Sequence, residues 1–246
     1  MSTAEIVTLT VLIFTAALLY SSVGHGGGSG YLAAMAIVGV IPAIMKPTAL
    51  TLNIVVAAIA SIKFLQAKCF SWSIFWPFAI TSIPLSFLGG SIKLQASVYK
   101  LVVGLILLYT AYRFWFISQK TANQNLRPIP LWAALFAGSA IGLISGLIGV
   151  GGGIFLSPLL LLMGWAEIRH TSGVAAVFIL VNSIAGLIGH VSKTAYIPLE
   201  TGFWAVAAAI GGWTGSHYGS QKFGNLTIGR LLAIVLVIAG LKLIFI

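Results

Sequence analysis

Long apolar segments alternate with short polar breaks along almost the whole chain. Bounded by charged or helix-breaking residues, they fall near residues 5–22, 31–41, 48–63, 72–89, 98–116, 131–148, 154–164, 172–190, 202–218 and 228–245. A membrane-spanning helix needs about 20 apolar residues. Eight segments are therefore long enough to span a bilayer, and two, 31–41 and 154–164, are too short alone. The pattern predicts an all-α polytopic membrane protein with about eight full transmembrane helices and two short half-helices.

A glycine-rich break precedes each of the two short segments. The first glycine cluster, Gly24–Gly30, reads GHGGGSG, and the second, Gly149–Gly153, reads GVGGG. No charged residue lies between Arg127 and Glu167, so the second cluster is expected at membrane depth. Irregular backbone is tolerated there only where protein or a water-filled cavity surrounds it. A helix that restarts after such a break has unpaired N–H groups and a positive dipole end, which together favour an anion.

The two halves of the chain correspond to each other. Gly24–Gly28 aligns with Gly149–Gly153, and Lys100-Leu101 aligns with Arg230-Leu231. The longest polar run, SQKTANQNLRPIP at 118–130, divides the chain. We therefore predict a first transmembrane repeat at 1–117, a polar linker at 118–130 and a second repeat at 131–246. Two helix breaks in corresponding places are typical of a transporter's binding site.

The basic residues predict how the chain is oriented. Thirteen Lys and Arg against three acids give a net charge of +10, but they are spread singly or in pairs over the loops. That distribution is typical of membrane topology signals rather than of a nucleic-acid partner. If all ten segments cross the membrane, more basic residues lie on the linker side, which predicts inverted repeats with the linker cytoplasmic and both termini outside. If the two short segments are re-entrant instead, the two sides carry nearly equal numbers of basic residues. The linker side holds Lys63, Lys68, Arg113, Lys120, Arg127, Arg169, Lys222 and Arg230, and the other side holds Lys46, Lys93, Lys100, Lys193 and Lys242.

The composition argues against an enzyme and against a metal or cofactor site. The chain is 59% hydrophobic and 7% charged, where a soluble domain carries about 25% charged residues. It has one cysteine, Cys69, and no aspartate, and it lacks HExxH, GxSxG and Walker sequences. No Lys or Arg precedes the first apolar run, so a retained helix is expected rather than a cleaved signal peptide. We expect no catalytic residue, no bound metal and no cofactor.

The stretch 145–164, SGLIGVGGGIFLSPLLLLMG, resembles the TauE/SafE family of sulfite exporters. The resemblance covers the whole chain, and Gly146, Pro158 and Gly164 stand in family-like places beside the second cluster. The first cluster departs from the pattern, because His25 stands where the second has Val150 and no proline follows closely. The resemblance implies export or uptake of sulfite, organosulfonates or related small anions.

Candidate substrate-binding residues lie in the clusters and at a few polar positions within apolar segments. The glycines can offer backbone N–H groups, although small residues also serve close helix packing. His25 can bond an anion or carry a proton near neutral pH. The threonines and serines at helix starts and the two buried asparagines have capping and interhelical bonding as alternatives. The full predicted set is His25, Gly26, Gly27, Gly28, Ser29, Thr48, Asn53, Gly151, Gly152, Gly153, Thr171, Ser172 and Asn182.

These observations predict a secondary transporter in the inner (plasma) membrane. The expected cargo is a small anion such as sulfite or a sulfonate, exported by alternating access at a midplane site built from the glycine breaks. An anion channel and a non-catalytic membrane subunit of a larger complex are the alternatives. Membrane lipid is an expected partner, and the sequence leaves open whether the chain forms a homodimer.

Overall fold

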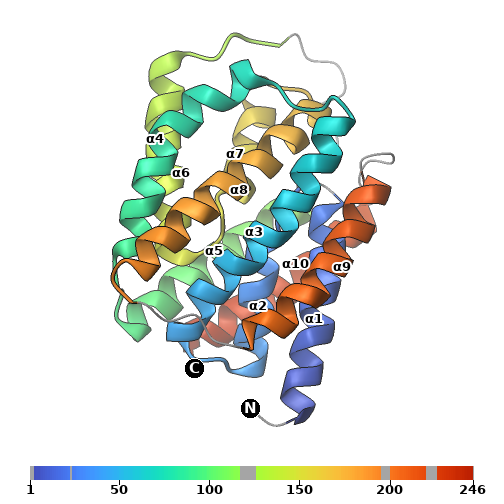
Figure 1. Cartoon of the computed structure of the whole chain (residues 1–246), viewed down its shortest axis with the longest axis vertical. Helices are drawn as coiled ribbons and strands as arrows, with labels where there is room; N and C mark the ends of the chain where they lie inside the picture. Colours follow the sequence, from blue (N-terminus) through green and yellow to red (C-terminus); the bar gives the residue numbers. More distant parts are fainter. Residues whose placement is uncertain (1–2, 23, 117–125, 195–199, 220–225, 246) are drawn as a thin grey trace.

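The computed structural model describes residues 3–22, 24–116, 126–194, 200–219 and 226–245. Within these ranges the chain forms ten α-helices and no β-strand (Figure 1). Residues 118–125 of the predicted linker lie outside the described part. The helices are α1 (Thr3–Ser21), α2 (Gly28–Val38), α3 (Pro42–Gln66), α4 (Trp72–Ser91), α5 (Ala96–Phe116), α6 (Leu131–Ile148), α7 (Gly153–Leu162), α8 (Ile168–Val191), α9 (Thr201–Gly219) and α10 (Leu226–Phe245).

Among the described residues, six helices are long and apolar enough to cross a membrane by length and composition: α1, α3, α4, α5, α6 and α8. The sequence predicted eight such spans. The second half of α9 carries Trp, Thr, Ser, His and Tyr, which lower its hydropathy, and the side chains in the first part of α10 lie outside the described residues. The two short helices expected after the glycine clusters are α2 and α7, with 11 and 10 residues.

Glycines in the left-handed conformation delimit both short helices. Gly27 precedes α2 with φ 99°, and Gly152 precedes α7 with φ 85°. Such angles strain residues that carry a Cβ, and glycine adopts them readily. The same conformation recurs at three pairs of positions that are 125 residues apart, namely Gly24 with Gly149, Gly27 with Gly152, and Gly39 with Gly164. The backbone thus breaks in the same way in both halves.

Helices of the two halves interlock. The first half's α4 packs on α6 and α8, and the second half's α9 packs on α1 and α3. The pair α3 and α8 runs antiparallel, since Arg169 at the start of α8 donates to the carbonyl of Ala67 after α3, while Gly186 lies near Leu50 early in α3 (Figure 1). The pair α5 and α10 is antiparallel too, because Gly104 lies near Ile244.

The two ends of the bundle differ in which parts of the chain they hold. Figure 1 shows the N- and C-termini at one end, called here the termini end, and the segment 126–130 at the other, the linker end. Helix α3 runs from the termini end to the linker end, and α8 runs in the opposite direction. An odd number of passages through the bundle therefore separates each terminus from the linker.

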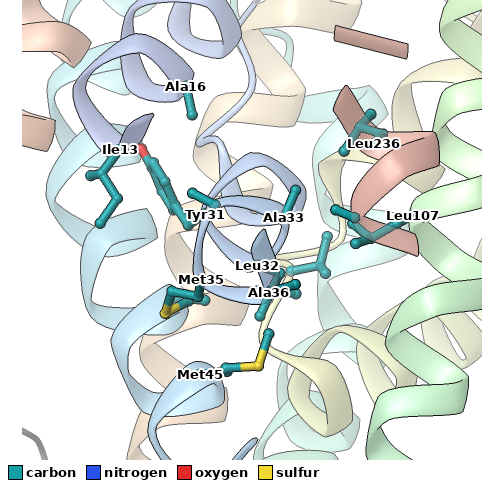
Figure 2. Packing of buried hydrophobic residues seen from close by; sticks show 14 of the residues in the cluster. Ile13, Ala16, Tyr31, Leu32, Ala33, Met35, Ala36, Met45, Leu107 and Leu236 are labelled. Atoms are coloured by element: carbon teal, nitrogen blue, oxygen red, sulfur yellow. The ribbon is translucent and has the colours of Figure 1, made fainter. Parts of the chain in front are cut away.

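Helix α2 is enclosed by protein along nearly its whole length. All its residues from Gly28 to Ala36 are buried. Figure 2 shows Tyr31, Met35 and Leu32 of α2 packed among side chains such as Met45 and Leu236 from neighbouring helices. A short helix with a broken start is tolerated at membrane depth when protein surrounds it in this way.

Candidate functional site

Asn53 of α3 lies between the two glycine clusters. The side chain is fully buried, and its Nδ2 donates to the carbonyl of Gly149 at 3.3 Å. A Cβ built at Gly26 would lie 2.8 Å from its Oδ1, and one at Gly28 would lie 2.6 Å from its Nδ2. A Cβ built at Gly151 would lie 3.2 Å from the same Nδ2. Both clusters therefore approach one buried amide, and only glycine fits this closely.

Ile179 of α8 occupies the matching place from the other half. A Cβ at Gly26 or at Gly151 would lie 2.8 Å or 2.7 Å from its Cγ2, and Gly153 contacts the same side chain. Asn53 thus meets Gly26, Gly28 and Gly151, while Ile179 meets Gly151, Gly153 and Gly26. Gly151 and Gly153 follow Gly26 and Gly28 by 125 residues, so the glycines around Asn53 and those around Ile179 are the corresponding glycines of the two halves. The two helices therefore cross at a pair of equivalent positions, of which one is polar and one is apolar.

The helices α2 and α7 begin at this crossing without side-chain caps. The residues that precede them, Gly27 and Gly152, have no side chain with which to cap the helix. The clusters also touch directly, since a Cβ at Gly28 would lie 2.7 Å from the carbonyl oxygen of Val150. The first N–H groups of a helix have no intrahelical partner. Two positive dipole ends thus meet inside the protein, an arrangement that favours an anion.

The first glycine cluster is held by hydrogen bonds to aromatic residues. The Tyr31 hydroxyl donates to the carbonyl of Gly26 at 2.7 Å, and the backbone N–H of His25 donates to the carbonyl of Tyr20 at 2.9 Å. The hydroxyl of Ser29 donates to the Tyr20 hydroxyl at 3.0 Å. Ser29, a predicted ligand, therefore faces α1 rather than Asn53. His25 is half-buried beside this cluster.

The second glycine cluster is surrounded differently, by two serines and by apolar side chains. Ser183 Oγ lies 2.9 Å from a Cβ built at Gly151, and Ser145 Cβ lies 3.5 Å from one built at Gly152. Both serines are fully buried, and neither hydroxyl has a hydrogen-bond partner in the described part of the chain. Sequence reasoning named neither as a ligand, although Ser145 opens the family-like stretch 145–164 and Ser183 directly follows the candidate Asn182.

The remaining predicted residues take other partners. Thr48 is hydrogen-bonded to Thr201 at the start of α9, 3.2 Å away. Ser172 donates to Ile168 of its own helix at 3.1 Å, and its backbone lies against Gly24. Asn182 donates to Phe178 at 2.8 Å, while Thr171 is buried with a hydroxyl that lacks a partner among the described residues. The structure therefore gathers Gly26, Gly28, Gly151, Gly153 and Asn53, whereas Thr48 bonds to α9 and the side chains of Ser172 and Asn182 bond within α8.

Several basic side chains are engaged at helix ends instead of at the clusters. Lys46 is buried, and its Nζ donates to the carbonyls of Gly89, Gly90 and Ile92 at 3.2, 2.7 and 3.1 Å. These bonds use all three of its N–H donors. Lys242 donates to the carbonyl of Ile37 at 2.8 Å in the same manner. Basic groups stabilise helix C-termini, where carbonyls lack partners.

The acids lie on the surface. Glu5, Glu167 and Glu200 are exposed, so none brings negative charge to the crossing of α3 and α8. In the described part of the chain no group of three or more His, Cys, Asp or Glu side chains could hold a metal ion. Around the clusters the described polar groups are amide, hydroxyl and backbone N–H dipoles together with half-buried His25.

Comparison with known proteins gives matches over almost the whole chain. The profile of the family described as "Sulfite exporter TauE/SafE" matches residues 9–243. A protein of Sinorhizobium fredii (strain NBRC 101917 / NGR234) described as "Probable membrane transporter protein y4hK" is 39% identical over 247 residues, covering 98% of this chain and 99% of that protein. No solved structure matches the chain. The family profile confirms the resemblance that the glycine motif indicated.

Proposed function

The chain belongs to the TauE/SafE family of sulfite exporters, and from this we propose that it is a secondary transporter of small oxyanions. The similar protein from Sinorhizobium fredii, named a probable membrane transporter, and the six apolar helices support a multi-pass membrane transporter. Sulfite or an organosulfonate is the proposed cargo, and the inner membrane is the proposed location. The observation that carries the proposal is the meeting of two uncapped helix starts at the buried Asn53.

The site would hold an anion by dipoles and not by a fixed charge. Half-helix N-termini that point at an anionic substrate are a recurring device of transporters. Lys46, which is buried near the termini end, has its three donors occupied by carbonyls. A buried salt bridge would be costly to separate in each cycle. Dipolar donors can select an oxyanion and still release it.

The proposed transport cycle is alternating access around this site. Three observations support inverted repeats: the antiparallel run of α3 against α8, that of α5 against α10, and the shared end of the two termini (Figure 1). The proposed units are 1–117 and 131–246. Rocking of one repeat against the other would expose the crossing of α3 and α8 first to one end of the bundle and then to the other.

A flux assay in proteoliposomes tests this function. Wild-type protein should move labelled sulfite or methanesulfonate with saturation, and unlabelled anion on the far side should accelerate exchange. Asn53→Leu keeps the branched shape of the side chain but removes the amide, and it should abolish exchange, whereas Ser61→Ala, which alters another buried polar position of α3, should not. Flux without saturation or exchange would instead favour a channel. Failure of the pure protein to move any oxyanion would favour a subunit of a larger complex.

A further inference from the structure

The two glycine clusters are equivalent in backbone but not in polar surroundings. Around the first cluster, the hydroxyls of Ser29 and Tyr31 donate hydrogen bonds to Tyr20 and to Gly26. Around the second, the hydroxyls of Ser145 and Ser183 lack partners among the described residues. Asn53 Oδ1, which lies at the crossing, lacks one too. The two unpaired serine hydroxyls thus lie beside the second cluster, while the unpaired Asn53 Oδ1 lies beside Gly26 of the first.

Buried polar groups in proteins are nearly always paired, so unpaired ones mark a place where water or a ligand supplies the partner. Ser145 and Ser183 belong to different helices, α6 and α8, yet both lie against the start of α7. Ser61, Ser157 and Thr171 also have buried hydroxyls without a partner among the described residues, so what distinguishes Ser145 and Ser183 is their shared position beside one helix start. Their convergence on an uncapped helix N-terminus indicates a shared ligand.

Building on the proposed function, we infer that the anion binds asymmetrically, at the start of α7, with Ser145 and Ser183 donating to its oxygens. The first cluster, closed by its own hydrogen bonds, then serves as the supporting wall. The Ile179 side chain occupies the space where a Cβ of Gly151 or Gly153 would lie. In this proposal it moves aside when the anion enters.

The apolar residues around the same cluster extend the inference to the substrate class. Ile141 and Phe178 lie against Gly152, and Ile179 lies against Gly151 and Gly153, the same short stretch that the two serines approach. An anion with one oxygen-rich end and one apolar end matches both sets of side chains. A fully oxygenated inorganic dianion would place oxygens against apolar groups and lose hydration without compensation. The site therefore favours an alkyl sulfonate over sulfate.

The test compares Ser145→Ala and Ser183→Ala with the matched control Ser61→Ala, whose hydroxyl is also buried without a partner but lies about 12 Å further along α3 from Asn53. Methanesulfonate is the probe, because it stays fully ionised. Titration calorimetry on the full-length protein in nanodiscs should show about tenfold weaker binding for each of the two variants. Ser183→Thr, which keeps the hydroxyl, should bind better than Ser183→Ala, and Ser61→Ala should match wild type.

Thermal stability without ligand provides a readout that a structural serine would not give. Removing an unpaired buried hydroxyl should leave the unliganded protein as stable or more stable, while the stabilisation by methanesulfonate shrinks. Binding unchanged in both serine variants, equal weakening in Ser61→Ala, or sulfate binding as tightly as methanesulfonate would overturn the inference. Wild-type protein that neither binds nor transports any oxyanion would overturn the proposed function itself.

Discussion

At the scale of single residues, Lys46 shows how a charge is accommodated inside this bundle. It stands near the start of α3, yet it caps the end of α4 through three carbonyls. A buried ammonium needs partners for each of its donors, and helix-end carbonyls need donors in turn. Lys46 therefore joins two helices at the termini end, with its three donors bonded to carbonyls.

Lys46→Met should destabilise the protein by at least about 1–3 kcal/mol, the cost of leaving even one buried carbonyl unpaired. Thermal unfolding in detergent measures the change. Lys93→Met removes an exposed lysine from the same end of the bundle and should have little effect. Equal unfolding temperatures for the two variants would show that Lys46 is not a structural cap.

The glycines that precede α2 and α7 lead to a second prediction at this scale. Gly27→Val and Gly152→Val should each abolish sulfite exchange in proteoliposomes, because valine resists φ values of 99° and 85° and its side chain would meet Tyr31 or Phe178. Gly202→Val serves as control, since nothing lies within 4 Å of a Cβ there. Transport at the wild-type level in either cluster variant, with normal insertion, would reduce that cluster to a packing device.

At the scale of elements, the contact between α4 and α6 depends on glycines that let two backbones approach. A Cβ at Gly142 or Gly146 of α6 would meet the backbone of Ser82 or Ser86 of α4. Gly211 and Gly215 of α9 lie in the same way against Phe14 and Leu18 of α1. Small residues at such crossings are the usual means of close helix packing in membranes. Glycine therefore has two roles in this chain, in helix seams and in helix breaks.

Gly146→Ala should destabilise the bundle by about 1–3 kcal/mol, because the added methyl group overpacks a contact between backbones. Gly202→Ala makes the same chemical change where nothing lies within 4 Å, so its effect should be small. Thermal unfolding of both variants, followed by size-exclusion chromatography, measures the difference. A Gly146→Ala protein as stable as the control would mean that the α4–α6 seam adapts easily.

At the scale of the whole molecule, the arrangement of the ends bears on orientation in the membrane. Both termini lie at one end of the bundle and residues 126–130 at the other (Figure 1). Among the basic residues, Lys46, Lys242 and Arg169 donate to carbonyls at helix ends. In the count from the sequence, the linker side holds eight basic residues and the other side five.

The positive-inside rule then predicts a cytoplasmic linker and termini outside the cytoplasm. Alkaline phosphatase fused after Ile246 should be active, and a reporter that works only in the cytoplasm should be silent there. The same pair of reporters fused at Ala122, after five passages through the bundle, should give the opposite pattern. Cytoplasmic activity at Ile246 would reverse the predicted orientation.

The sequence by itself determined the helical segments, the two short helices and the glycine breaks. These features depend on local properties: apolar runs of sufficient length, and glycines free to adopt left-handed angles such as those of Gly27 and Gly152. It also identified the family, because the motif at 145–164 is contiguous. Asn53 was among its candidates, as a polar residue within an apolar segment.

Only the tertiary structure decided which of these residues meet. The pairing of Asn53 with Ile179 depends on the crossing of helices more than 100 residues apart in the chain. So do the unpaired Ser145 and Ser183 at the start of α7, because a serine in a helix looks the same in sequence whatever it faces. The hydrogen bonds of Lys46 to carbonyls at the end of α4 could not be predicted from the sequence either. Hydropathy and helix breaks act along the chain, whereas partners for buried polar groups are chosen by packing across it.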